Sequence, residues 1–193
     1  MDAQNVTPMM QQYLSAKAAH PNELLFFRLG DFYEMFFDDA KIAAKELGLT
    51  LTSRSGDLDK SPMCGVPYHA ADSYIARLVA KGFKVAIAEQ IGDPKAKGLT
   101  HREVVKVVTP GTTLSDDLLR DASNNYIVLL HETCGGNFVL AGADISTGEA
   151  FYASYAGEPA AQQILDELYR RMTAELLMTE GFSLANAVRE FAV

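Results

Sequence analysis

A phenylalanine and a glutamate stand two residues apart at Phe32 and Glu34, within the apolar segment FFRLGDFYEMFF of residues 26–37. If this segment is extended, both side chains project from one face of the strand and Tyr33 projects from the other. A carboxylate is costly to bury without a partner, whereas an exposed phenylalanine gives up its favourable burial. The pattern alone favours a core Phe32 with Glu34 at a helix start. The other interpretation has both side chains pointing outward, with the ring as a wedge between DNA base steps and the carboxylate beside it.

The residues just before this pair form a turn signal. Gly30 and Asp31 follow an apolar stretch, and we expect them to shape a turn that presents Phe32. Arg28 lies just ahead of the turn, where it either braces the presented ring or caps the edge of a strand.

Other residue types give little indication of catalysis. The histidines His20, His69, His101 and His131 do not stand at metal-ligand spacing. The sequence contains neither a phosphate-binding glycine loop of the GxxxxGK[ST] type nor a GxSxG nucleophile motif. Cys64 could act as a nucleophile near His69, but a small apolar residue beside a turn is the favoured interpretation.

Asp144 supports an alternative function. A carboxylate on an early strand of a meander that continues into helices is where ribonuclease H-like nucleases place a metal ligand. Two-metal chemistry needs several convergent carboxylates, and the nearby strand positions supply only Glu132 and Glu149. A turn role before residues 146–148 is favoured, and a metal-dependent nuclease that uses Asp144 stays the alternative.

The composition is that of an ordinary globular protein. Of 193 residues, 48% are hydrophobic and 22% charged, which excludes a disordered or coiled-coil chain. No apolar run reaches the roughly 20 residues of a membrane-spanning helix, and the N-terminus does not resemble a secretory signal. With two cysteines, the chain is expected in the reducing cytoplasm, without contact with a membrane.

The charge is distributed unevenly along the chain. The net charge is −8, and residues 116–193 carry all of it, with 4 basic and 12 acidic side chains. Residues 54–106 hold 9 basic and 6 acidic side chains. Only the first part of the chain is therefore suited to face a polyanion.

Secondary-structure signals predict a mixed α/β chain in two parts. In the first part, helices are expected at residues 8–18, 38–47 and 69–81, and strands at 23–29, 32–35, 49–54, 84–90 and 102–109. Residues 55–63 and 91–101 are expected to be loops.

Pro110, Gly111 and a cap signal at 115–117 indicate a boundary between modules. Beyond it we expect a three-stranded meander, a helix, a strand and a helical tail, at residues 126–131, 137–144, 149–154, 159–172, 175–179 and from 184 onward.

Four sequence blocks resemble the bacterial MutS family of DNA mismatch-repair proteins. They are FFRLGDFYEMFFDDA, PMCGVPYHAADSYIARLVAKG, KVAIAEQIGDP and REVVKVVTPGT, in the family's order. The later segments NNYIVLL and FVLAGADISTGEAF are similar to the family's connector domain. The resemblance implies a mixed α+β mismatch-recognition domain over residues 1–115. It also implies an incomplete, ribonuclease H-like α/β connector domain over residues 116–193.

The resemblance also implies a site and its partners. The family's Phe-x-Glu motif falls on Phe32, which would stack on a mispaired base, and on Glu34, which would hydrogen-bond to that base. Contacts to the DNA backbone or grooves are expected from basic residues of the first part, namely Arg54, Lys60, Lys95, Lys97, Arg102 and Lys106.

The implied partners are mismatched double-stranded DNA, the protein MutL and, in the full-length family, a second copy of the chain. ATP and Mg²⁺ are implied for the full-length family only. We expect this chain to be a non-catalytic module without a cofactor or metal of its own, monomeric and weakly bound to DNA.

Overall fold

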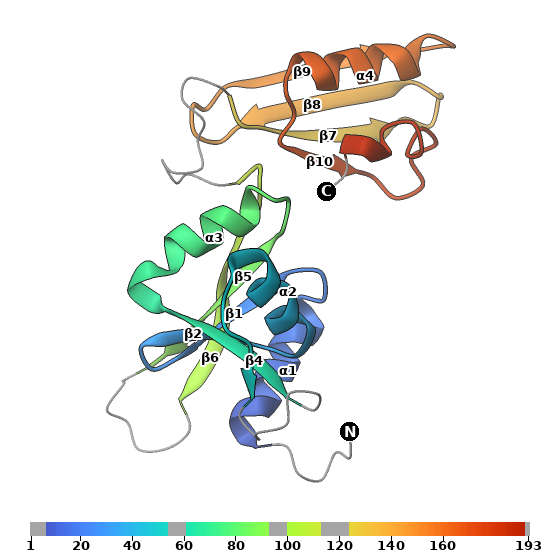
Figure 1. Ribbon diagram of the computed structural model, residues 1–193. Helices are drawn as coiled ribbons and strands as arrows, with labels where there is room; N and C mark the ends of the chain where they lie inside the picture. Colours follow the sequence, from blue (N-terminus) through green and yellow to red (C-terminus); the bar gives the residue numbers. More distant parts are fainter. Residues whose placement is uncertain (1–6, 54–60, 93–99, 113–123, 192–193) are drawn as a thin grey trace. The chain divides into compact units, whose positions relative to one another are not determined.

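The computed structural model describes residues 7–53, 61–92, 100–112 and 124–191 (Figure 1). The chain divides into two compact units, a first unit up to Val108 and a second unit from Thr109. The predicted domain boundary near residue 115 falls outside the described residues. Each unit combines a β-sheet with helices, so the predicted α/β class is confirmed.

The first unit is built on a six-stranded mixed sheet with the order β3-β4-β2-β1-β5-β6. Its strands are β1 (Leu24–Leu29), β2 (Phe32–Phe36), β3 (Thr52–Ser53), β4 (Pro62–Pro67), β5 (Val85–Ile91) and β6 (His101–Val108). Strands β1 and β5 are parallel, and the other neighbours are antiparallel.

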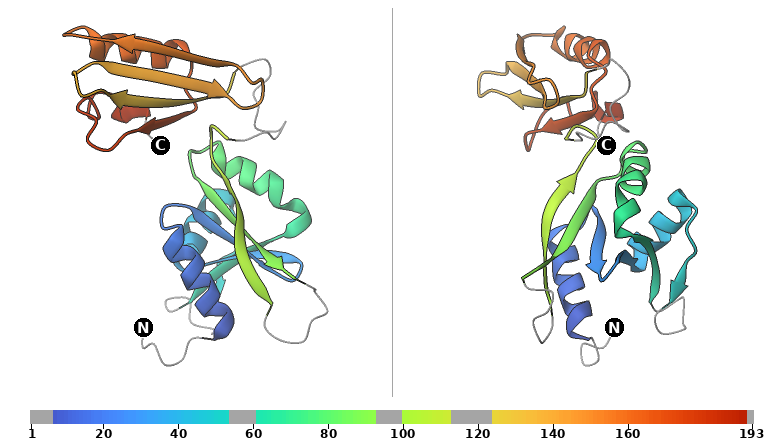
Figure 2. Two further views of the ribbon diagram at one scale, coloured as in Figure 1. Left: turned by 180° about the vertical axis from the view of Figure 1, so that it is seen from behind. Right: turned by 90° about the vertical axis from the view of Figure 1, so that its left-hand side faces the viewer.

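Helices cover both faces of this sheet (Figure 2). They are α1 (Pro8–Ala19), α2 (Phe37–Leu47) and α3 (Ala71–Val79), the last preceded by the 3₁₀ turn η1 (Tyr68–Ala70). Helix α1 starts at an N-cap threonine, Thr7, and packs the buried Tyr13 edge-on against Phe27 and Phe36. Helices α2 and α3 lie on the opposite face, where the Cys64 thiol contacts the Ala40 carbonyl oxygen at 3.5 Å.

A buried carboxylate joins three elements of the first unit. Asp39 of α2 accepts hydrogen bonds from the backbone N–H of Leu25 at 3.0 Å and from the Tyr13 hydroxyl at 3.4 Å, and pairs with Lys17 at 2.9 Å. Burial, together with this carboxylate, raises the pKa of the Tyr13 hydroxyl. These partners compensate the desolvation of Asp39 and tie α1 and α2 to β1.

The second unit has a four-stranded sheet with the order β10-β7-β8-β9. Strands β7 (Tyr126–Glu132), β8 (Phe138–Asp144) and β9 (Ala150–Tyr155) form the predicted meander, and β10 (Glu175–Met178) pairs parallel to β7. Helix α4 (Ala160–Arg170) covers one face and buries Ile164 and Leu168 in the core.

Three local predictions were wrong. The first residues of strand β4 were expected to be part of a loop. Prolines at both ends of β4 and Gly65 within it are unfavourable for a strand, and pairing with β2 is what holds these residues in a strand. The strand predicted at 49–54 shortens to β3 within the described residues. The tail from residue 184 forms turns and a 3₁₀ turn, η2 (Arg189–Phe191), instead of an α-helix.

No helix among the described residues has the length and hydropathy to cross a membrane.

Candidate nucleic-acid interface

The candidate site lies at the tip of the β1–β2 hairpin. Leu29 pairs with Phe32 across a two-residue turn formed by Gly30 and Asp31. Gly30 has a φ of +59°, and a Cβ at this position would meet no atom within 4 Å. The backbone conformation, rather than lack of space, therefore requires glycine, as at the first position of a type II′ hairpin turn.

Phe32 is the first residue of β2, and 47% of its surface is exposed. Its strand neighbours Tyr33, Met35 and Phe36 are all buried. The core interpretation of Phe32 is therefore wrong. The hairpin tip presents an aromatic residue with about half of its surface open to solvent.

Glu34 lies on the same face of β2 as Phe32, because side chains alternate along a strand. It is partly buried and stands between Phe27 of β1 and Gly65 of β4. A Cβ on Gly65 would lie 3.5 Å from the Cγ of Glu34, an ordinary van der Waals distance, so this glycine lies directly beside the Glu34 side chain. Helix α2 begins only at Phe37, and the expected place of Glu34 at a helix start is therefore wrong.

Behind the hairpin, four side chains form a polar cluster on the opposite face. The Tyr33 hydroxyl donates a hydrogen bond to Glu89, and the Arg28 guanidinium lies 3.6 Å from the same carboxylate. Arg28 also lies 3.8 Å from the ring centroid of Tyr68. Burial and the contact with Glu89 raise the pKa of Tyr33 to about 12. Sequence reasoning considered Arg28 as a brace, but missed Glu89 and gave Tyr68 no part in it.

Of the predicted basic contacts, Arg102 and Lys106 lie on β6, and the remaining four, Arg54, Lys60, Lys95 and Lys97, lie outside the described residues. Lys106 is exposed. Arg102 is partly buried and donates hydrogen bonds to the carbonyl oxygens of Arg28 at 2.6 Å and Thr100 at 2.9 Å. Burial lowers the pKa of this guanidinium. Arg102 thus connects β6 to the end of β1 beside the turn.

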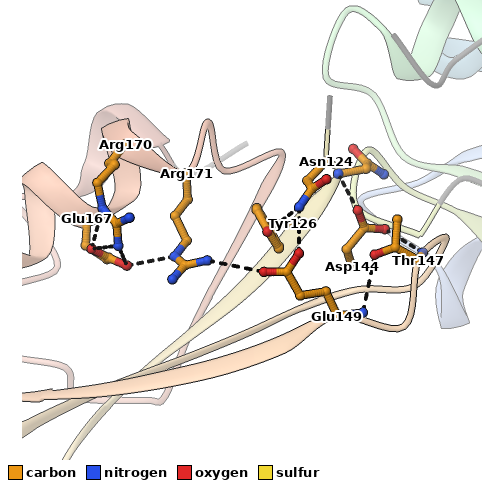
Figure 3. Close-up of polar contacts among 9 residues, drawn as sticks. Asn124, Tyr126, Asp144, Thr147, Glu149, Glu167, Arg170 and Arg171 are labelled. Atoms are coloured by element: carbon orange, nitrogen blue, oxygen red, sulfur yellow. Dashed lines mark hydrogen bonds and ion pairs between the residues drawn. The ribbon is translucent and has the colours of Figure 1, made fainter. Parts of the chain in front are cut away.

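Asp144 is the buried centre of a turn in the second unit (Figure 3). Its Oδ1 accepts hydrogen bonds from the backbone N–H and the hydroxyl of Ser146, at 2.8 and 2.6 Å, and from the N–H of Thr147 at 3.3 Å. Its Oδ2 accepts from the N–H of Asn125 at 3.0 Å. Burial raises the pKa of this carboxyl, but the hydrogen bonds outweigh burial and the pKa is lowered overall.

The neighbouring carboxylates are engaged elsewhere. Glu149 accepts a hydrogen bond from Asn124 at 2.9 Å and faces Arg171 at 3.8 Å (Figure 3), and Glu132 accepts the N–H of Ser183. In the part of the chain that the structure describes, no three His, Cys, Asp or Glu side chains gather as a metal site would require. The hydrogen bonds of Asp144 therefore favour its role in the turn.

The two thiols occupy different environments. Cys64 is buried in β4, and desolvation raises its pKa to about 11, so its thiol is not activated as a nucleophile. Cys134 is exposed in the turn between β7 and β8. Cys64 therefore packs the core, as the favoured interpretation of the sequence has it.

Comparison with known proteins identifies the family of this chain. The model of MutS domain I matches residues 7–117, more than half of the chain. This chain belongs to the MutS family. The match includes all of the first unit's described elements, and the resemblance drawn from the four sequence blocks is confirmed.

Curated MutS relatives match almost the whole chain. The DNA mismatch repair protein MutS of Desulforamulus reducens is 52% identical over 176 residues, which are 90% of this chain and 20% of the relative. The MutS protein of Syntrophomonas wolfei is 50% identical over 188 residues, 95% of this chain and 22% of the relative. The MutS protein of Brevibacillus brevis is 52% identical over 173 residues. The chain thus spans about a fifth of the length of these MutS relatives.

Proposed function

We propose that this chain recognises mismatched or unpaired bases in duplex DNA and thereby initiates mismatch repair. In this proposal Phe32 enters the minor groove as a wedge, and Glu34 contacts the displaced base. The observation that carries the proposal is the exposed ring of Phe32 at the tip of a tight hairpin, with a carboxylate on the same face two residues later. Membership of the MutS family supports it.

The energetics of a single wedge favour mismatches over normal pairs. Stacking of a base on an aromatic ring contributes roughly 1–3 kcal/mol. Separating a base step costs about a few kcal/mol, and least where the base is already mismatched. The insertion of Phe32 therefore nearly balances its cost at a mismatch and is unfavourable at a paired step. The deformability of the DNA, more than base identity, then sets the preference.

Glu34 adds a second level of discrimination. A carboxylate in the negative potential of the minor groove is unfavourable unless it accepts a hydrogen bond from a base N–H, or is itself protonated and donates one. Both require a base edge that a normal pair does not offer. We therefore assign to Glu34 the rejection of matched DNA more than the affinity for mismatched DNA.

The second unit has a different proposed role. Its meander, crossover helix and parallel fourth strand support assignment as part of a ribonuclease H-like connector domain that contacts other domains and MutL. We propose that the chain has no catalytic activity of its own and acts in the cytoplasm. Dimerisation and the use of ATP and Mg²⁺ are proposed for the longer proteins of the family.

The test uses a chimera in which this chain replaces the aligned residues of the Desulforamulus reducens relative. Fluorescence anisotropy compares its binding to a duplex with one G·T mismatch and to the matched duplex. We expect the wild type to prefer the mismatch, Phe32→Ala to lose that preference, and Glu34→Ala to lose discrimination more than affinity. The matched control for Phe32 is Tyr152→Ala, since Tyr152 is an 81% exposed ring in the second unit. A preference that survives Phe32→Ala would contradict the proposal.

A further inference from the structure

The turn that presents Phe32 is held at both of its backbone carbonyls. The carbonyl oxygen of Gly30 accepts a hydrogen bond from Nε of Arg28 at 2.5 Å. The carbonyl oxygen of Asp31 accepts one from the backbone N–H of Tyr68 at 2.9 Å. Both carbonyls are thus fixed by residues outside the turn.

The side chain of Arg28 is in turn fixed by its neighbours. Only 17% of it is exposed, and its guanidinium lies 3.8 Å from the ring centroid of Tyr68 and 3.6 Å from the carboxylate of Glu89. The hydroxyl of Tyr33 donates to this same carboxylate. A planar guanidinium can stack on a ring and donate hydrogen bonds in its plane at the same time, which a lysine ammonium cannot do.

This cluster lies on the face of the sheet opposite to the proposed wedge. Arg28 and Tyr33 are paired across β1 and β2, and Glu89 lies on β5, the other neighbour of β1. Phe32 and Glu34 project from the other face, because side chains alternate along β2. The cluster can therefore hold the hairpin rigid without occupying the space into which a base would stack.

We propose that Arg28 is a positioning residue, which fixes the hairpin turn and thereby sets the direction in which Phe32 and Glu34 project. The inference rests on the proposed function, since it assigns a support to the wedge named there. It gives a physical reason for a mostly buried arginine beside an exposed hairpin tip. Insertion between base steps requires a ring whose direction is fixed before the DNA binds, because ordering it on binding would reduce the affinity.

The competing role for Arg28 is a direct contact with a DNA phosphate. A phosphate contact contributes equally on matched and mismatched duplexes, and its removal lowers the slope of log K against log salt by about 0.9. A positioning residue affects only the mismatch preference and leaves this slope unchanged. The low exposure of Arg28 and its pairing with Glu89 favour positioning.

The experiment measures the mismatch preference of the chimera described above at several salt concentrations, for Arg28→Lys, Arg28→Gln and Phe32→Ala. We expect both Arg28 variants to reduce the preference by about two- to thirtyfold, the range of couplings through contacting side chains. Binding to matched DNA and the salt slope should not change. Arg77→Lys is the matched control, since Arg77 also donates to a backbone carbonyl, that of Leu47 at 3.2 Å, and lies 6.0 Å from the ring centroid of Tyr74.

Each outcome decides between named alternatives. Full preference in Arg28→Lys would overturn the positioning role, and equal weakening on both duplexes with a lower salt slope in Arg28→Gln would assign a phosphate contact instead. If the Arg28 variants do not fold, Tyr68→Leu removes the stacked ring at the surface, and a retained preference there overturns the proposal. If Phe32→Ala keeps the wild-type preference, the proposed function itself fails. Loss in Phe32→Ala with retention in Arg28→Lys rejects only the present inference.

Discussion

The two hairpin turns around Gly30 and Asp144 reach a fixed shape by opposite means. The turn after β8 is organised from within, because the buried carboxylate of Asp144 accepts hydrogen bonds from the residues of the turn and from Asn125. The turn after β1 is organised from outside, by Arg28 and the backbone of Tyr68. The Asp144 turn is therefore fixed mainly by its own residues, whereas the Gly30 turn depends on groups from β1 and η1, so substitutions outside the turn should change how its tip is presented.

The largest expected effect is at Asp144. Asp144→Ala removes the acceptor of these buried hydrogen bonds and should lower the free energy of unfolding of the second unit by about 3 kcal/mol. Asp144→Asn, which keeps one carbonyl acceptor, should lower it by less. Urea denaturation followed by circular dichroism measures both. Asp166→Ala is the control, because among the hydrogen bonds described that exposed carboxylate accepts only one, from Gln162. If Asp166→Ala lowers the free energy of unfolding as much as Asp144→Ala, Asp144 has no special role in stability.

Gly142 of β8 and Gly65 of β4 allow the packing tightness of the two sheets to be compared. A Cβ on Gly142 would lie 2.3 Å from the ring of Phe151, whereas on Gly65 the nearest atom is the carbonyl oxygen of Tyr33 at 3.3 Å. Gly142→Ala should therefore destabilise the protein by about 1–3 kcal/mol through overpacking, and Gly65→Ala by less. Thermal unfolding measures the difference.

The control for these two substitutions is Gly135→Ala, where the nearest atom to a Cβ is the side-chain nitrogen of Asn137 at 3.9 Å. If Gly65→Ala proves as costly as Gly142→Ala, the two sheets are equally tight at these positions. In the mismatch assay we expect only Gly65→Ala to have an effect, because this glycine lies against Glu34.

Two turn glycines separate stability from function. Gly30 and Gly148 have φ values of +59° and +76°, and a Cβ would be unobstructed at both. Alanine at either should cost about 1–2 kcal/mol in stability, from the left-handed backbone conformation alone. Only Gly30→Ala should reduce the mismatch preference. Equal effects of the two variants on DNA binding would show that the hairpin tip has no particular role.

The smallest effect at neutral pH concerns the ionisation of the first unit's polar cluster. Because the folded state raises the pKa of Tyr33 from 10.0 to about 12, its stabilising contribution is complete below pH 10 and is lost as the pH rises through 12. Tyr33→Phe should reduce this alkaline loss, which denaturation at increasing pH measures. The turn at Asp144 weakens in the opposite direction, as the pH falls through the lowered pKa of that carboxyl. An unchanged alkaline loss in Tyr33→Phe would remove Tyr33 as its source.

Sequence reasoning located most helices and strands, but it did not predict which strands pair with one another. Helix α1 and the meander followed from local signals, namely the N-cap at Thr7 and glycine turns between apolar runs. Strand β4 did not, because it depends on pairing with β2, which local propensity does not contain.

The same limit applies to the candidate site. The spacing of Phe32 and Glu34 placed both on one face, but their exposure could not be deduced from the pattern, which favoured burial of the ring. Arg28 was noticed from its place before the turn. Its partners, Glu89 and Tyr68, come from sequence positions far from it, and only the fold brings them together.

The different exposure of the two cysteines makes thiol labelling a measure of local unfolding in the first unit. Each unit contains one thiol, buried at Cys64 in the first and exposed at Cys134 in the second. A thiol reagent should label Cys134 at once and Cys64 only during excursions in which β4 separates from its neighbours. In a Cys134→Ser background, the labelling rate of Cys64 thus measures how often β4, the strand paired with β2 of the Phe32 hairpin, separates from the sheet.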